Sequence, residues 1–464
     1  MALAALVQAG SGLAGQLSLR TTGERTVSTS STNSWKPYLL WAWMLTTFAN
    51  FRVRSVVDLT AGDMFDGQVL FQVASWLCFG VIAAWAVLRG RANGSLVRRG
   101  PLAWYSGFIG LALISAAYSP LPELTAFTAL QHAIALVLVI SLGKRLHDLW
   151  PFVLMYMLVN WLLVILGALH MDFGLAWITP PELSQIWTDH EEWRFGTAFG
   201  HPSQLGIVAA TAAFMLTSGP KKAVGRGFAA MLTLLTLLAT ISRTAIAGFA
   251  AALLFFAAKQ RLVLVLCLSG SLLTLAILIE PSRNVVLSYV ARGQNADDIA
   301  SLTGRVPVFE DAISRARVHW MFGQGFLSSR ILLLNDLGEG NGTVHPHNMF
   351  LAAINGMGIG GAVLALGSLI SLFVAAARLL RLSHHYPSVR ADAVSCASAL
   401  LPLAAFCILD AGFVAKLNPF VLLYLTAAAR TQDMLNSIES NLPERVAIGP
   451  RLPGGPPEIP ALTC

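Results

Sequence analysis

The sequence predicts an all-α polytopic membrane protein with about 12 transmembrane helices and one large outer loop that contains amphipathic helices. Hydrophobic residues make up 55% of the 464 residues and charged residues only 12%, about half of the ~25% that is usual in soluble domains. The mean hydropathy is +0.65. The apolar residues fall in runs long enough to cross a hydrocarbon core of about 30 Å. These figures exclude a water-soluble enzyme, a nucleic-acid-binding domain and a disordered protein.

Twelve apolar runs are the candidate spans. They are 35–51, 69–88, 102–118, 124–142, 149–169, 200–217, 227–241, 244–258, 262–280, 347–376, 394–411 and 413–429. We expect them to form one membrane domain at residues 35–435. Residues 1–34 are rich in Ser, Thr and Gly and lack the pattern of a signal peptide, whereas residues 436–464 are rich in Pro. We interpret both ends as flexible cytoplasmic tails.

Lys and Arg in the short loops predict the orientation, because these residues accumulate on the cytoplasmic side. With the N-terminus inside, the inner loops hold 14 of them: Arg89, Arg91, Arg98, Arg99, Lys144, Arg145, Lys221, Lys222, Arg226, Lys259, Arg261, Arg378, Arg381 and Arg390. The short outer loops hold five: Arg52, Arg54, Arg194, Arg243 and Lys416. Both termini are therefore expected in the cytoplasm, with the long loops 170–199 and 281–346 on the opposite side. The net charge of +7 then reflects topology and does not indicate a nucleic-acid partner.

Few ionisable side chains lie inside the predicted spans. His132 and Asp410 are the clear cases, and an intramembrane charge is costly and often functional. His132 lies beside Gln131 and fits a packed, hydrogen-bonded helix contact, while Asp410 lies near the end of a span. We interpret both residues as structural. The small-residue run that begins at Gly356 and ends at Gly361 predicts close helix packing.

Polar residues concentrate at three places on the outer side. The first is the stretch Arg-Phe-Gly-Thr-Ala-Phe-Gly-His-Pro, residues 194–202, which leads into the sixth span and contains Arg194 and His201. Its composition also fits an ordinary Gly/Pro turn with aromatic residues at the membrane interface.

The second place is the turn that contains Ser242 and Arg243. It joins two apolar segments of roughly 15 residues, each of which covers about 22 Å and falls short of the hydrocarbon core. The turn should therefore lie below the outer surface, with Arg243 in a protein-lined or aqueous recess, because bare lipid penalises a charge and open backbone. The alternative is an arginine that extends to the interface.

The third place is the loop 281–346. Apolar residues recur there at helical spacing and predict an amphipathic helix; they are Val306, Phe309, Ile313, Ala316 and Trp320. Thr303 is a plausible N-cap, and Pro307 is tolerated because it falls in the first turn. Arg305 lies at the end where the helix dipole favours anions. An anionic ligand would resolve this conflict, since helix N–H groups and a guanidinium would both bind it. The alternative is an ordinary solvated arginine.

The loop ends in a glycine-rich stretch followed by Val-His-Pro-His-Asn, residues 344–348, at the start of a span. The pair His345 and His347 could bind a metal, but no Asp, Glu or Cys partner stands at a clear spacing. A histidine at the mouth of a span can instead serve as a general base or a hydrogen-bond donor.

These motifs, in this order, resemble the O-antigen ligase and polysaccharide polymerase superfamily of bacterial inner membranes. They are Arg-x-Gly-Thr-x-x-Gly-His-Pro, Ser-Arg-Thr-Ala, Thr-Gly-Arg and His-Pro-His-Asn-x-x-Leu. The number of spans and the late, large periplasmic loop at 281–346 match as well, and the resemblance covers roughly residues 35–430. Ser203 departs from it, because many relatives carry Asn there, so we assign no role to that position.

The resemblance implies a multi-span glycosyltransferase of the C type in the bacterial inner (cytoplasmic) membrane, with its active site facing the periplasm. Such enzymes move a glycan from an undecaprenyl-diphosphate carrier to an acceptor, with inversion and without metal or cofactor. The acceptor is lipid A-core in a ligase and a second lipid-linked glycan in a polymerase, and the sequence does not separate the two. Membrane lipids are the other expected partners, and nucleic acid is not. The alternative is a transporter or flippase of a lipid-linked saccharide, which shares the basic outer face and needs no base.

The resemblance also implies roles for single residues. His347 would be the catalytic base, and Arg305 and Arg243 would clamp the diphosphate leaving group. The substrate-binding residues would be Arg194, His201, Ser242, Thr303, His345 and Asn348. No metal ligand is expected.

Overall fold

The structure is a computed structural model in which the chain divides into two compact units, Met1–Pro37 and Tyr38–Cys464. It describes residues 36–48, 67–142, 150–168, 176–178, 195–197, 199–218, 226–259, 271, 280, 305–327, 347–410 and 412–440. The description below concerns the second unit.

The described part of the chain is almost entirely helical, as the sequence predicts. Its α-helices are α2 (Lys36–Thr46), α4 (Gly67–Leu88), α5 (Pro101–Ser115), α6 (Pro122–Leu142), α7 (Trp150–Ala168), α9 (Pro202–Ser218), α10 (Arg226–Ala239), α11 (Arg243–Lys259), α15 (Arg305–Val318), α17 (Met349–Ser383), α18 (Pro387–Leu409) and α19 (Pro419–Ser440). A short 3-10 helix, η1 (Gly94–Val97), precedes α5. The one departure from an all-α fold is a small antiparallel pair of strands, β1 (Ala176–Ile178) and β2 (Phe195–Thr197).

A helix overlaps each predicted span except 262–280, of which only two positions are described. The largest difference is at the C-terminal end, where α19 starts at Pro419, six residues after the predicted 413, and continues to Ser440, inside the predicted tail. Gly412 has a left-handed backbone with φ 54°, and the side-chain oxygen of Asn418 accepts from the N–H of Val421. These two features delay the start of α19, because the helix begins only after its cap.

Four helices are long and apolar enough to cross a membrane by length and composition. They are Gly67–Leu88, Pro122–Leu142, Met349–Ser383 and Val389–Leu409. Shorter apolar helices accompany them at Pro101–Ser115, Pro151–Leu166, Pro202–Leu216 and Gly227–Ala239. Many large apolar side chains point outward, among them Leu77, Val81 and Ile370, which are 64%, 71% and 51% exposed. Outward apolar faces are typical of an integral membrane protein; the count of 12 spans stays a prediction.

α17 is broken at Gly358, where φ is 67° and ψ is −164°. An unbroken helix of 35 residues would measure about 52 Å, far more than the hydrocarbon core requires. The break leaves residues 359–383, about 37 Å long, as the part that can span, and residues 349–357 as a separate short helix before it. The span predicted at 347–376 thus overlaps the candidate span Met349–Ser383, but it contains a kink that the sequence did not predict.

The chain that follows α15 fills the break and satisfies the backbone groups that the break exposes. Three backbone hydrogen bonds join the segments: the N–H of Gln324 to the carbonyl of Asn355 at 2.8 Å, that of Gly325 to Gly356 at 2.7 Å, and that of Ile359 to Trp320 at 2.7 Å. A Cβ on Gly358 would lie 2.1 Å from the carbonyl oxygen of Met321. The close approach and the positive φ both require glycine here.

The amphipathic helix predicted in the outer loop is confirmed as α15, with Arg305 as its first residue and Pro307 in its first turn. Its buried residues are Val308 and Ala312, 5% and 0% exposed. The predicted apolar face is therefore only partly correct, since Ile313 and Trp320 are 40% and 53% exposed.

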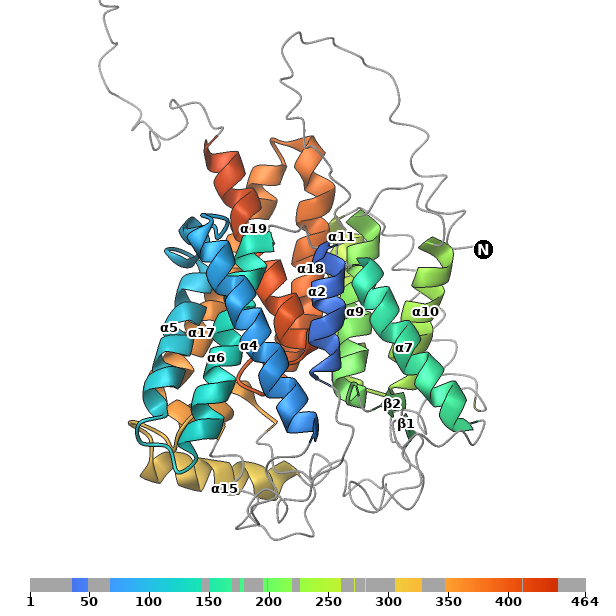
Figure 1. Cartoon of the computed structure of the whole chain (residues 1–464). Helices are drawn as coiled ribbons and strands as arrows, with labels where there is room; N and C mark the ends of the chain where they lie inside the picture. Colours follow the sequence, from blue (N-terminus) through green and yellow to red (C-terminus); the bar gives the residue numbers. More distant parts are fainter. Residues whose placement is uncertain are drawn as a thin grey trace, which may run out of the picture. The chain divides into compact units, whose positions relative to one another are not determined.

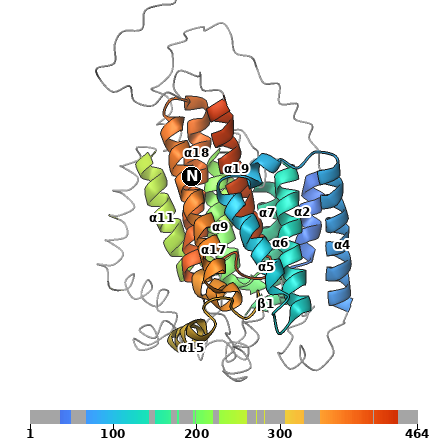
Figure 2. The same ribbon diagram turned by 90° about the vertical axis from the view of Figure 1, so that its left-hand side faces the viewer.

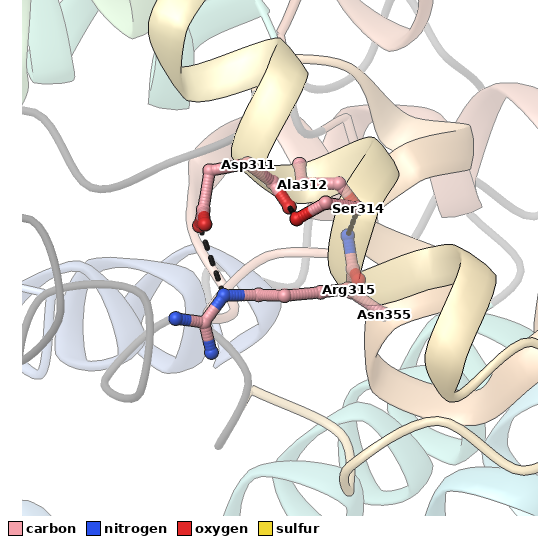
Figure 3. A network of polar contacts seen from close by, with 5 residues as sticks. All are labelled: Asp311, Ala312, Ser314, Arg315 and Asn355. Carbon is pink, nitrogen blue, oxygen red and sulfur yellow. Dashed lines mark hydrogen bonds and ion pairs between the residues drawn. The ribbon is translucent and has the colours of Figure 1, made fainter.

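The shift of the buried face follows from the contact with α17. The Asn355 side-chain amide donates to the carbonyl of Ala312 at 3.0 Å and turns that side of α15 toward the short helix before the break. An ion pair between Asp311 and Arg315, 2.9 Å apart, lies on the same helix (Figure 3).

α15 lies across one end of the helix bundle, at the bottom of Figure 1. α9, α11, α17 and α19 begin at this end and α18 ends at it, and the view from the side agrees (Figure 2). We call it the site end of the bundle. The described residues of the loops that the positive charges assign to the outer side, such as the turn before Arg243, lie at this end.

Gly358→Ala is expected to destabilise the protein by about 2–5 kcal/mol, because it combines a left-handed alanine with a clash against the backbone of residue 321. Thermal unfolding of the purified protein in detergent measures this loss. Gly110→Ala in α5 is the matched control, since a Cβ there has no atom within 4 Å. If both variants unfold at the wild-type temperature, the break is not needed for stability.

Candidate functional site

Phe195–Thr197, the described part of the Arg-x-Gly-Thr motif, form strand β2, and α7 holds this strand in place. The ring of Phe195 stacks on that of Trp161 with centroids 4.4 Å apart. The hydroxyl of Thr197 donates to the side-chain carbonyl of Asn160. The hydroxyl of Tyr156 donates to the carbonyl of Phe199 at 3.0 Å. Sequence patterns did not predict these strands, because their pairing depends on the tertiary contact with α7.

His201 directly precedes α9, which begins at Pro202. Its Nδ1 accepts from the N–H of Ser203 at 3.3 Å and lies 2.7 Å from the hydroxyl of Ser203. These contacts are those of a residue that caps a helix N-terminus. Ser203, the position that departs from the family pattern, thus interacts with the neighbouring histidine, while a substrate role for His201 stays a prediction.

The Ser-Arg-Thr-Ala turn packs on α9, the helix that follows the first motif. Ser242 is 2% exposed; its carbonyl accepts from the N–H of Ile246 at 2.9 Å and its hydroxyl from that of Ala245 at 3.4 Å. A Cβ on Gly206 in α9 would lie 2.8 Å from the Cβ of Ala245 and 3.1 Å from that of Ser242. Ser242 therefore acts as the N-cap of α11, and the turn lies in a protein-lined position.

Arg243 is the first residue of α11 and is partly buried. The helix runs antiparallel to α18, and Gly248 of α11 packs against α18: a Cβ on Gly248 would lie 3.2 Å from the Cβ of Ala405. Five residues closer to the site end, the corresponding residues are Arg243 on α11 and Asp410 directly after α18. The pairing therefore brings the Arg243 turn to the level at which α18 ends.

His347 and Asp410 lie side by side at the site end. Nδ1 of His347 lies 3.8 Å from Oδ1 of Asp410, and the two side chains are 15% and 18% exposed. This is an ion-pair distance and is longer than a hydrogen bond. The sequence interpretation of Asp410 as structural stays a prediction, and the structure adds that this carboxylate lies beside the candidate base. An intramembrane carboxylate was the signal for it in the sequence.

Asn348 fixes this arrangement through both ends of its side chain. Its carbonyl oxygen accepts from the N–H groups of Phe350 and Leu351, at 2.9 and 3.1 Å, and so caps α17. Its amide donates to the carbonyl of Ile408 at 3.0 Å, at the end of α18. One side chain therefore ties the start of the helix after His347 to the end of the helix before Asp410.

His132 has the structural role that its neighbourhood predicts. Its Nδ1 lies 2.6 Å from the hydroxyl of Tyr105, and its Nε2 lies 3.1 Å from the carbonyl of Ala415. The contact with Ala415 holds the connection between α18 and α19, the segment that follows Asp410. His132 thus supports the site from within the bundle and does not belong to it.

Backbone strain concentrates in these segments. The non-glycine residues with positive φ in the described ranges are Ile241, Leu327 and His347, with φ of 46°, 65° and 37°. Ile241 precedes Ser242, Leu327 ends the segment that fills the α17 break, and His347 is the candidate base. Such conformations cost about 1–3 kcal/mol each and persist where the surroundings impose them, often at functional sites.

The structure describes the remaining predicted site residues only in part or not at all. Arg305 is the first residue of α15, which puts its backbone at the site end, while its side chain lies outside the described residues. Arg194, Thr303 and His345 also lie outside them. Within the described ranges, no group of three or more His, Cys, Asp or Glu side chains could hold a metal ion.

Residues 228–366 match the family model described as O-antigen ligase. The matched segment contains α11, α15 and the break in α17, and with them Arg243, Arg305 and His347. The match confirms the resemblance to the O-antigen ligase and polysaccharide polymerase superfamily and supports a glycan transfer of that general kind. No curated protein matches the chain.

Asn348→Ala is expected to destabilise the protein by about 1–3 kcal/mol, because it removes an N-cap and the side-chain hydrogen bond to the end of α18. Asn348→Asp keeps the cap and loses only the donor to Ile408, so it should recover part of the loss. Thermal unfolding of the three proteins in the same detergent gives the comparison. Equal stability of the Ala variant and the wild type would contradict the double role of this side chain.

Proposed function

We propose that the protein transfers a glycan from an undecaprenyl-diphosphate carrier to an acceptor hydroxyl, as an O-antigen ligase or as an O-antigen or exopolysaccharide polymerase. The reaction takes place at the periplasmic face of the bacterial inner membrane, inverts the anomeric centre and uses no metal. The support comes from the family match over residues 228–366 and from the side chains gathered at the site end.

One observation carries this proposal: the histidine and carboxylate pair lies at the end of the bundle where two helices begin with arginine. His347 is 3.8 Å from Asp410, and α11 and α15 begin with Arg243 and Arg305. Both arginines stand at the positive end of a helix dipole, a place where helix N–H groups also attract anions. A diphosphate is an anion that suits such positions.

His347 serves as the general base in this reaction. It removes the proton of the acceptor hydroxyl while that oxygen forms a bond to the anomeric carbon, and the bond from that carbon to the diphosphate oxygen breaks. The electron pair leaves with the diphosphate. Asp410 faces the side of the imidazole that carries Nδ1, so it stabilises the imidazolium that forms. Nε2 is then the nitrogen left to accept the proton.

Arg243 and Arg305 stabilise the leaving group. Negative charge grows on the diphosphate as the glycosidic bond breaks, and guanidinium groups bind phosphate oxygens through paired hydrogen bonds. Ser242 directly precedes Arg243, and Thr303 lies two residues before Arg305. We assign these two residues to substrate binding, together with Arg194, His201, His345 and Asn348.

Purified protein reconstituted with a lipid-linked donor tests the function. Formation of a new glycosidic bond on a second lipid-linked glycan indicates a polymerase, and formation on lipid A-core indicates a ligase. Movement of donor across the bilayer without a new bond would instead indicate the transporter or flippase.

His347→Ala is expected to lower transfer by about 10²–10⁴-fold, which is the usual contribution of a positioned base. Arg305→Ala should also reduce transfer strongly, because one cation is removed from the leaving group. Both variants should elute and unfold like the wild type, since the proposal gives each side chain a role in the reaction and not in folding. Wild-type turnover by either purified variant would remove that residue from the mechanism.

Asp410→Asn is expected to lower the turnover number by at least about 10-fold with little change in KM, because the imidazolium loses its counter-charge in the transition state. Asp433→Asn is the matched control. Asp433 pairs with Arg430 at 2.9 Å near the far end of α19, and its loss should leave turnover unchanged. Similar effects of the two substitutions would argue that any lost carboxylate acts through stability alone.

A further inference from the structure

The chain that leaves α15 carries a cluster of outward apolar side chains. Val318, Trp320, Met321 and Phe322 are 74%, 53%, 52% and 65% exposed. Arg317 and His319 are exposed between and beside them. An exposed apolar cluster rimmed by polar residues marks a surface that meets a partner.

This cluster, residues 318–322, is held rigidly with its side chains outward. The carbonyl of Trp320 accepts from the backbone N–H of Ile359 at 2.7 Å, and the N–H of Gly323 donates to the backbone carbonyl of His319 at 2.8 Å. The hydroxyl of Tyr118 donates to the carbonyl of Phe322, also at 2.7 Å. The cluster therefore cannot turn inward without breaking bonds to both α17 and the end of α5.

The cluster continues an apolar face of the bundle. One row of exposed side chains runs along the spanning part of α17: Ile359, Val363, Leu366, Ile370 and Val374, which are 48%, 50%, 41%, 51% and 61% exposed. Their spacing of three or four residues puts them on one side of the helix. The row starts at Ile359, the residue bonded to Trp320. Ile114 of α5 is another outward apolar side chain and is 65% exposed.

The break in α17 sets the depth of the cluster. Residue 359 is the first residue after the break, and the outward apolar row of α17 starts there, so we place Trp320 near the end of the part of α17 that faces lipid. Tryptophan is enriched at this level in membrane proteins, and arginine beside it can reach the headgroups.

From these observations we infer that residues 318–322 are a membrane anchor: Trp320, Met321 and Phe322 insert into the outer leaflet and contact lipid acyl chains. The anchor seats α15 on the bilayer surface, with Arg317 and His319 among the headgroups. This goes beyond the proposed glycan transfer, because it rests on exposure, hydrogen bonds and the break, and would hold for any activity of the site end.

Site-specific photo-crosslinking tests the anchor. Benzoylphenylalanine is incorporated at Trp320, Met321 or Phe322, and the protein is reconstituted in vesicles of phosphatidylethanolamine and phosphatidylglycerol. Illumination followed by intact-protein mass spectrometry counts covalent lipid adducts. Ile370, on the apolar row of α17, is the positive control. Glu310 is the negative control, because it is exposed on the side of α15 opposite Val308 and Ala312.

We expect lipid adducts at 320–322 in a yield close to that at Ile370 and several-fold above that at Glu310. A yield equal to that at Glu310 would overturn the anchor, and so would crosslinks to a second protein chain in place of lipid. The unaltered protein gives a second measurement: a lipid with a photoreactive acyl chain should label residues 318–322, mapped by peptide mass. Neither readout uses glycan transfer, so failure of the anchor and failure of the proposed function are distinguishable.

Discussion

The contact between the break in α17 and the chain after α15 is the constraint on which the site end depends. Three backbone hydrogen bonds cross it, and they join the carbonyls of Asn355 and Gly356 and the N–H of Ile359 to the segment 320–325. A break in a membrane helix exposes polar backbone groups that lipid cannot satisfy. The same bonds that compensate for the break also fix an extramembrane helix to a spanning one. The loop helix that begins with Arg305 and the short helix that follows His347 are therefore held by one junction.

Polar side chains continue this arrangement from the junction to the end of α18. Asn348 caps α17 and reaches the carbonyl of Ile408, and His132 holds the carbonyl of Ala415 on the far side of Asp410. Asp410 thus lies between two fixed points of the backbone. The strained φ of 37° at His347 is consistent with this, because a chain tied on its C-terminal side to α18 has little freedom to relax. A candidate base gains from such rigidity, since its distance to the reacting oxygen decides its efficiency.

The sequence predicts most of the fold because that part depends on local patterns. Apolar runs locate the helices, and the spacing of apolar residues with Pro307 near the start locates α15. The sequence does not predict the break in α17. The left-handed conformation of Gly358 depends on the close approach of Met321, 37 residues away in the chain, and a run of small residues is equally compatible with close helix packing. For the same reason the sequence does not predict that Asp410 lies beside His347: their proximity depends on the packing of α17 against α18. The family resemblance, and not a local pattern, singles out the arginines and His347 among the several cations and histidines of the outer loops.

The position of the break also bears on where the proposed chemistry takes place. If residue 359 marks the start of the hydrocarbon core, the short helix 349–357 and the His347–Asp410 pair lie on its aqueous side, at the level of the headgroups. A diphosphate linked to a polyprenyl chain would rest at that level, because its charge excludes it from the core and its tail excludes it from water. Helix N-termini with arginine as first residue are there as well, in α11 and α15. The broken helix thus brings a base to the depth at which a lipid-linked anion can reach it, which an unbroken helix of 35 residues would not.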